Sequence, residues 1–77
     1  MHRQVKSLRF DVFGTQVLVS RLEDHWMTFY IGAEGKRRLA SDIVVPADMP
    51  ESEIEQYLGD LCHEWATDQH PSVKRIA

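Results

Sequence analysis

The sequence contains a single cysteine, Cys62, and no long apolar run. One cysteine cannot form an internal disulfide, which is typical of a protein in a reducing compartment, and a structural zinc site built from several cysteines is excluded as well. A membrane helix needs roughly 20 consecutive apolar residues, and no stretch of the chain approaches that length. Residues 1–6 also lack the apolar core of a secretory signal. We therefore predict a cytoplasmic protein without a membrane segment.

The chain is short and its charge is unevenly distributed. Its 77 residues predict one domain spanning 1–77, with so small a core that a second subunit could contribute to its stability. Residues 1–38 carry a net charge of +3 and residues 39–77 a net charge of −6. Because the whole chain is acidic, we interpret this division as a sheet and a helix with solvated faces of opposite sign, rather than as a polyanion-binding front.

The first half of the chain alternates apolar and polar residues with a period of two, which predicts strands at about 5–13, 16–22 and 26–31. A type II′ turn centred on Gly14 and Thr15 would pair Val12 with Val17. A second reversal at 23–25 would pair Leu22 with Trp26. This register places one apolar set on the inner face of the sheet: Leu8, Phe10, Val12, Val17, Val19, Met27, Phe29 and Ile31.

The second half of the chain changes to a helical period. Apolar residues recur at helical spacing from Ile54 to Trp65, which predicts an amphipathic helix over about 49–68. Asp48 is the candidate N-cap, and Ser52 with Glu55 is a second candidate slightly later. Residues 37–45 are compatible with a fourth strand, and residues 69–77 form a tail. The predicted fold is α+β: an antiparallel meander of three or four strands, β-β-β-(β)-α, packed by one C-terminal helix.

The face of the sheet turned away from this helix is the first candidate site. By the register above, it displays an aromatic and aliphatic set without a cover: Leu18, Leu22, Trp26, Thr28 and Tyr30. Uncovered apolar patches with polar edges are typical of partner or self-association surfaces. We therefore expect a non-enzymatic interaction module that binds a second copy or another protein, unless the tail or residues 36–45 cover this face.

Nucleic-acid binding is the alternative function. Lys36, Arg37 and Arg38 follow a turn, and Tyr30 is expected on the neighbouring strand. A sheet supported by a helix can place such residues against phosphates or base edges. In element order alone, this arrangement is similar to the β-β-β-α arm-binding domains of tyrosine recombinases.

The remaining candidates for chemistry favour neither a metal site nor catalysis. His63 and Glu64 lack a second histidine at the spacing that metalloprotease helices use. Cys62 lies on the apolar stripe of the predicted helix, where a thiol is a core residue rather than a nucleophile. His25, beside Asp24, is expected to form a hydrogen bond in its loop. We predict no cofactor, no metal and no catalytic residue.

The segment 61–67, together with His70, Pro71 and Val73, resembles a family of short bacterial proteins of unknown function. Members of that family share a strand-rich first half and a helix that ends in a tryptophan-containing segment. The resemblance implies a stand-alone bacterial domain, and it implies no activity or catalytic residues.

Overall fold

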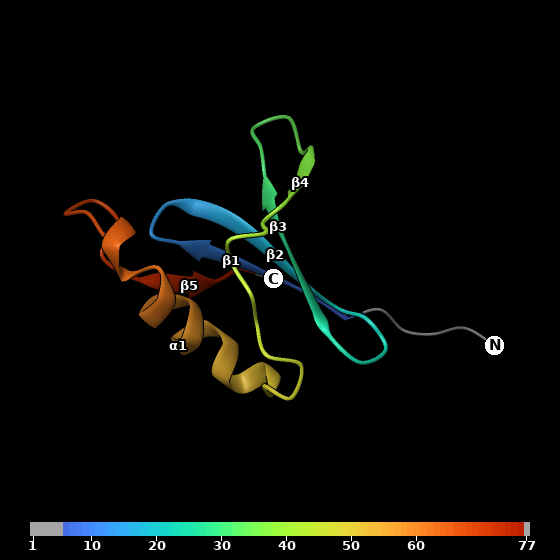
Figure 1. Cartoon of the computed structure of the whole chain (residues 1–77). Coiled ribbons are helices and arrows are strands. Elements are labelled where there is room, and N and C mark those ends of the chain that lie inside the picture. The colour runs from blue at the N-terminus through green and yellow to red at the C-terminus, as the bar shows by residue number, and fades with distance from the viewer. Residues whose placement is uncertain (1–5, 77) are drawn as a thin grey trace.

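The computed structural model describes residues 6–76, so Val5, the first residue of the first predicted strand, lies outside the described residues. One five-stranded sheet, in the order β4-β3-β2-β1-β5, carries a single α-helix (Figure 1). Every neighbouring pair of strands is antiparallel. The elements are β1 (Lys6–Val12), β2 (Thr15–Arg21), β3 (Trp26–Ile31), β4 (Arg37–Leu39), α1 (Glu51–Leu61), the 3-10 helix η1 (His63–Trp65) and β5 (Val73–Arg75). This arrangement confirms the α+β class and the C-terminal helix, and it adds a fifth strand.

The β1–β2 hairpin has a two-residue turn, as predicted, but the turn lies one residue earlier in the chain and is of a different type. Val12 pairs with Thr15, so the central residues are Phe13 and Gly14, with φ of 50° and 90°. Positive φ at both positions defines a type I′ turn, which matches the twist of two-residue hairpins. The predicted pairing of Val12 with Val17 is therefore wrong by two residues. Because side chains alternate with a period of two, an even shift leaves each one on its predicted face.

Gly14 is required at this turn for a second reason. A Cβ atom at this position would lie 2.9 Å from Cδ2 of the His70 ring, closer than real side chains approach. The Gly14 amide also donates to Oδ1 of Asp11 at 2.7 Å. The turn, the strand before it and the C-terminal segment therefore meet at one point.

The β2–β3 register differs from the prediction by one residue, and this difference exchanges the two faces of β3. Trp26 pairs with Arg21 rather than with Leu22, because the loop between the strands is one residue longer than predicted and closes with a bond from Leu22 N–H to the His25 carbonyl. An odd shift moves a whole strand to the other face. Trp26 and its alternate neighbours therefore share a side with Val17 and Val19, whereas Met27, Phe29 and Ile31 point the opposite way.

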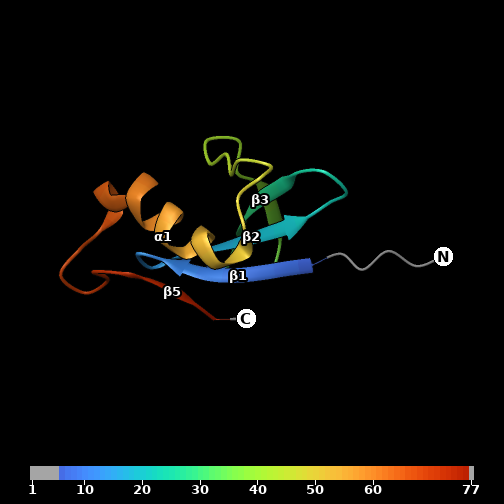
Figure 2. The same cartoon turned by 90° about the horizontal axis from the view of Figure 1, so that it is seen from below.

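The core lies between one face of the sheet and the segments that cross it. Figure 2 shows α1 and the chain between β4 and α1 on the same side of the sheet. The strands contribute Leu8, Phe10, Val12, Val17 and Val19, and α1 and its C-cap contribute Ile54, Leu58 and Cys62. Residues 37–45 form a strand only as far as Leu39. The irregular segment after it buries Ala40, Ile43 and Val45, so it is a cover for the core rather than a longer strand.

The helix is shorter than predicted, and the tail is ordered differently. α1 begins after Pro50 without a side-chain cap, so Asp48 does not cap it. It ends at Leu61, and Trp65 belongs to η1, with its ring centroid 6.3 Å from that of Tyr30.

The tail contributes β5, which pairs in plane with β1 through Val73 and Val12. Of the described residues, neither 69–76 nor 36–45 covers the second face of the sheet (Figure 2).

Candidate functional site

The side of the sheet opposite α1 has no layer on it within the described residues (Figure 2). We call this side the open face. Alternation along the paired strands places on it the apolar residues Leu18, Met27, Phe29, Ile31 and Leu39, with Ser7, Arg9, Asp11, Gln16, Ser20, Arg37 and Lys74 around them. None of these residues belongs to the core cluster.

A continuous apolar row crosses the open face. Leu18 pairs with Phe29, and Phe29 pairs with Leu39, so the three side chains lie side by side on β2, β3 and β4. Leu18 is only 4% exposed and forms the floor of the row, Phe29 is half-buried, and Leu39 is 54% exposed. Direct cross-strand neighbours of this kind pack against one another. The row therefore presents apolar surface to solvent without a covering layer.

The surface predicted from the sequence is divided between the two faces. Of the five residues proposed, only Leu18 lies on a strand position of the open face, and Leu22, which is 37% exposed, lies in the loop after β2. Trp26, Thr28 and Tyr30 belong to the side that α1 covers. The one-residue register shift is the cause, and it means that these five residues do not form one surface.

Trp26, Thr28 and Tyr30, which were predicted on the open face, each have a polar group that binds the segment between β4 and α1. The Trp26 indole N–H donates to the Met49 carbonyl at 3.0 Å. The Thr28 hydroxyl lies 3.0 Å from the Ala40 carbonyl and 2.6 Å from the Ile43 carbonyl. These polar groups were the available signal for the register, because a buried hydroxyl or indole N–H needs an acceptor.

The basic turn is divided as well. Arg38 lies on the covered side, with its guanidinium 5.5 Å from the centre of the Tyr30 ring. Arg37 lies on the open face because it is the neighbouring residue of β4. The Lys36 ammonium is 3.8 Å from a Glu34 carboxylate oxygen, and both side chains are largely exposed. Lys36, Arg37, Arg38 and Tyr30 therefore do not form one surface.

A depression of about 510 Å³ lies at the end of the open face where the β1–β2 turn and the β3–β4 turn meet. We call it the arginine pocket. Its lining consists of Arg9, Gly14, Thr15, Gln16, Ile31, Gly32, Ala33, Gly35 and Arg37. The lining holds two guanidinium groups and no carboxylate. It also contains no cysteine and no histidine.

On the covered side, Tyr30 and Cys62 have raised pKa values, and Asp42 contributes to both. The Tyr30 hydroxyl donates to Asp42 at 2.7 Å, and burial together with this carboxylate raises the pKa of Tyr30 to about 12. Burial, with Asp42 again contributing, raises the pKa of the Cys62 thiol. Both groups therefore stay protonated at neutral pH. Cys62 is a buried core residue, as the sequence predicts.

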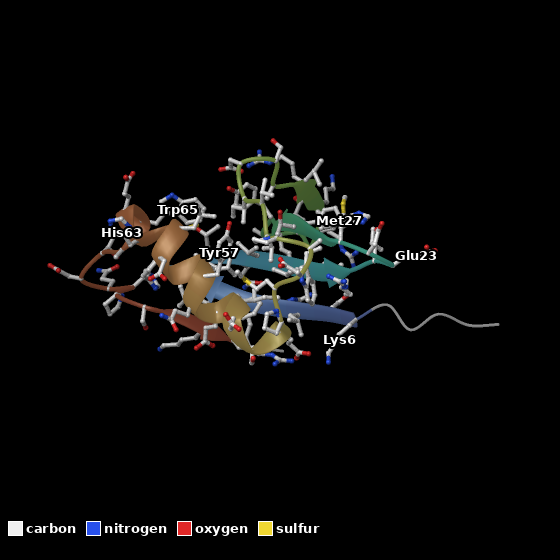
Figure 3. All side chains as sticks on the ribbon, turned by 60° about the horizontal axis from the view of Figure 1, so that its bottom comes forward. Lys6, Glu23, Met27, Tyr57, His63 and Trp65 are labelled. Atoms are coloured by element: carbon white, nitrogen blue, oxygen red, sulfur yellow. The ribbon has the colours of Figure 1, made fainter. Side chains whose placement is uncertain are left out.

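His25 and His63 each have a polar contact close by in the sequence. His25 Nδ1 lies 2.8 Å from Oδ1 of Asp24, which confirms the predicted loop hydrogen bond. Figure 3 shows Tyr57, His63 and Trp65 on the helical segment. His63 is exposed, with Nδ1 3.2 Å from the Asp60 carbonyl. Within residues 6–76, no three metal-binding side chains come together, and no helix there is long and apolar enough to cross a membrane.

The fold and the open face define a small α+β protein in which one helix covers one side of a five-stranded antiparallel sheet. The model of a domain of unknown function, DUF7661, matches residues 7–77, and the chain belongs to this family. This agrees with the resemblance to a family of unknown function that the sequence indicates, and it implies no activity. No curated protein and no solved structure matches the chain significantly.

Proposed function

We propose that this protein is a non-enzymatic, cytoplasmic interaction module whose open face binds a segment of a partner protein. The observation that carries the proposal is the apolar row of Leu18, Phe29 and Leu39, over which no layer lies within residues 6–76 and in which Leu39 is the most exposed side chain. Met27 and Ile31, both half-buried, extend the row on either side along β3. An apolar centre with a polar rim is the arrangement that protein interfaces use.

The charges around the row favour an acidic partner. Arg9, Arg37 and Lys74 lie on the open face, and Asp11 is the only carboxylate among the strand residues described there. Asp11 already accepts a bond from the Gly14 amide. Complementary charge steers a partner to a surface and excludes partners of like charge. The partner we propose is a segment with apolar side chains flanked by Asp or Glu.

The same charges argue against a second copy as the occupant. Two open faces packed against each other would bring the arginines and Lys74 of one copy toward those of the other, and such like-charge contacts are unfavourable. Nucleic acid is also less suited to this face, because its centre is apolar and the basic side chains lie at its margin. Nucleic-acid complexes depend instead on many phosphate contacts.

The proposal is tested by selecting peptides from a displayed random library on the immobilised full chain. We expect the selected peptides to combine apolar residues with Asp or Glu. Their affinity should fall by about tenfold when Leu39 is changed to serine, the loss that removing one well-packed apolar contact brings. Because Leu39 is 54% exposed, this substitution leaves the core intact.

Val44→Ser is the matched control, because Val44 is 68% exposed and lies in the segment after β4, away from the open face. It should leave peptide affinity unchanged. The proposal is overturned if no peptide is selected, if the peptides carry no acidic residues, or if both variants behave alike. Sedimentation that shows a dimer lost in Leu39→Ser would identify a second copy as the occupant. Salt-dependent binding of mixed DNA or RNA that Leu39→Ser abolishes would identify nucleic acid instead.

A further inference from the structure

We infer that the arginine pocket is an anion subsite of the open face and that it receives a carboxylate of the partner segment; this rests on the proposed function. Arg9 comes from β1 and Arg37 from β4, at opposite sides of the pocket. Within the described residues, neither guanidinium has an ion pair with a carboxylate. Guanidinium groups bind carboxylates through paired, charge-assisted hydrogen bonds. The pocket therefore contains two donors of the kind that an acidic side chain requires.

Two glycines of the lining, Gly32 and Gly35, contribute backbone alone to the wall of the pocket. A Cβ atom at Gly35 would meet nothing within 4 Å, and one at Gly32 would meet only the Lys36 carbonyl, at 3.7 Å. In this part of the wall, Ala33 adds only a methyl group. Gln16, which lies on the open face, adds an amide to the opposite wall, and Thr15 beside it also lines the pocket. Room for a side chain, with neutral donors beside two cations, suits a carboxylate that enters from the solvent.

The pocket is continuous with the apolar part of the open face, and this favours a peptide carboxylate over a free anion. Ile31 lines the pocket and also belongs to the apolar set. Arg9 lines the pocket and pairs with Leu18, the floor of the apolar row. An occupant that fills both places carries apolar groups and an acidic group on one molecule. A peptide segment has this combination, whereas inorganic phosphate does not.

The test compares Arg37→Gln with Lys36→Gln, which removes the same charge from the adjacent residue outside the pocket lining. The probe is an acidic peptide selected on the wild-type chain, measured by calorimetry. We expect Arg37→Gln to weaken binding about tenfold and Lys36→Gln to weaken it less than twofold, because only the former removes a donor that contacts the carboxylate. A peptide with its acidic residues changed to amides should bind wild type and Arg37→Gln equally.

The outcomes separate this inference from the proposed function. If Leu39→Ser weakens the peptide but Arg37→Gln and Lys36→Gln behave alike, the subsite is overturned and the apolar row stands. Acetate and inorganic phosphate are titrated into the ¹⁵N-labelled chain as free anions. If phosphate shifts the amides of 32–37 and peptides do not bind, the pocket is a site for a small phosphate group, and both the carboxylate assignment and the proposed function fail.

Discussion

At the residue scale, β3 is organised by the polar groups of its covered side. Three side chains alternate along the strand, those of Trp26, Thr28 and Tyr30. They bind four residues of the chain after β4: Met49, Ala40, Ile43 and Asp42. Thr28 is the most deeply buried of the three at 4% exposure. Its hydroxyl therefore fixes the segment after β4, which covers the core, against the sheet.

Thr28→Val tests this role. Valine has nearly the same shape but no donor. The Ile43 carbonyl would lose the hydroxyl, whereas the Ala40 carbonyl would keep its bond from the Ile43 N–H, and we expect a loss of about 1–3 kcal/mol in the free energy of unfolding. Thr15→Val is the control, because Thr15 is exposed at the start of β2, and its effect should stay within about 0.5 kcal/mol. Urea denaturation of both variants measures the difference. Equal stabilities would contradict the bonding role of the Thr28 hydroxyl.

At the element scale, α1 and β5 pack through a glycine. Gly59 lies in the second half of the helix, and a Cβ atom there would be 3.6 Å from Cγ2 of Val73, an ordinary contact distance. The helix thus approaches β5 closely, yet it leaves room for a methyl group. Gly14 differs, because its φ of 90° and the His70 ring at 2.9 Å both exclude a side chain.

We therefore expect Gly59→Ala and Gly14→Ala to change stability in opposite directions. Alanine at Gly59 should raise the free energy of unfolding by about 0.5–1 kcal/mol through helix propensity. Alanine at Gly14 should lower it by at least about 1 kcal/mol through backbone strain. Thermal unfolding followed by circular dichroism reports both changes. A Gly59→Ala variant less stable than wild type would show that the α1–β5 contact cannot accept a methyl group.

At the scale of the whole molecule, one carboxylate joins the first strand, the last strand and the helix. Glu51, at the start of α1, forms ion pairs with Lys6 of β1 and, at 2.9 Å, with Arg75 of β5. Lys6 is labelled at the beginning of β1 in Figure 3. The bond to Lys6, followed by the charges of Lys6 and Arg75, lowers the pKa of Glu51 below its ordinary value of 4.5. This contact agrees with the interpretation of the charge asymmetry as attraction between a sheet and a helix.

The lowered pKa sets the direction of the pH dependence. The folded state binds the Glu51 proton more weakly than the unfolded state does, so the contribution of Glu51 is complete above the ordinary value of 4.5 and is lost as pH falls through the folded pKa. We expect the stability difference between wild type and Glu51→Gln to be constant near about pH 7 and to shrink below about pH 4.5. Urea denaturation over a pH series measures it. A difference that does not change with pH would show that the ion pairs add nothing.

The amino-acid sequence by itself determined the positions of the first three strands, the amphipathic helix and the burial of Cys62, because each depends on a local period that one segment carries. It also predicted that one face of the sheet would lack a cover. It did not determine which side of β3 that face would show. Both sides of this strand are apolar, with Trp26 and Tyr30 on one and Phe29 and Ile31 on the other.

Only the tertiary structure decided this question. The length of the β2–β3 loop and the acceptors on the segment after β4 select the register, and these acceptors come from residues far along the chain. The candidate site followed from that choice. Phe29 lies on the open face and Trp26 on the covered side, the reverse of the prediction, because a one-residue difference in strand pairing exchanges the two faces. The arginine pocket likewise exists only because the sheet brings the turns next to β1 and β4 together, and no local pattern encodes that contact.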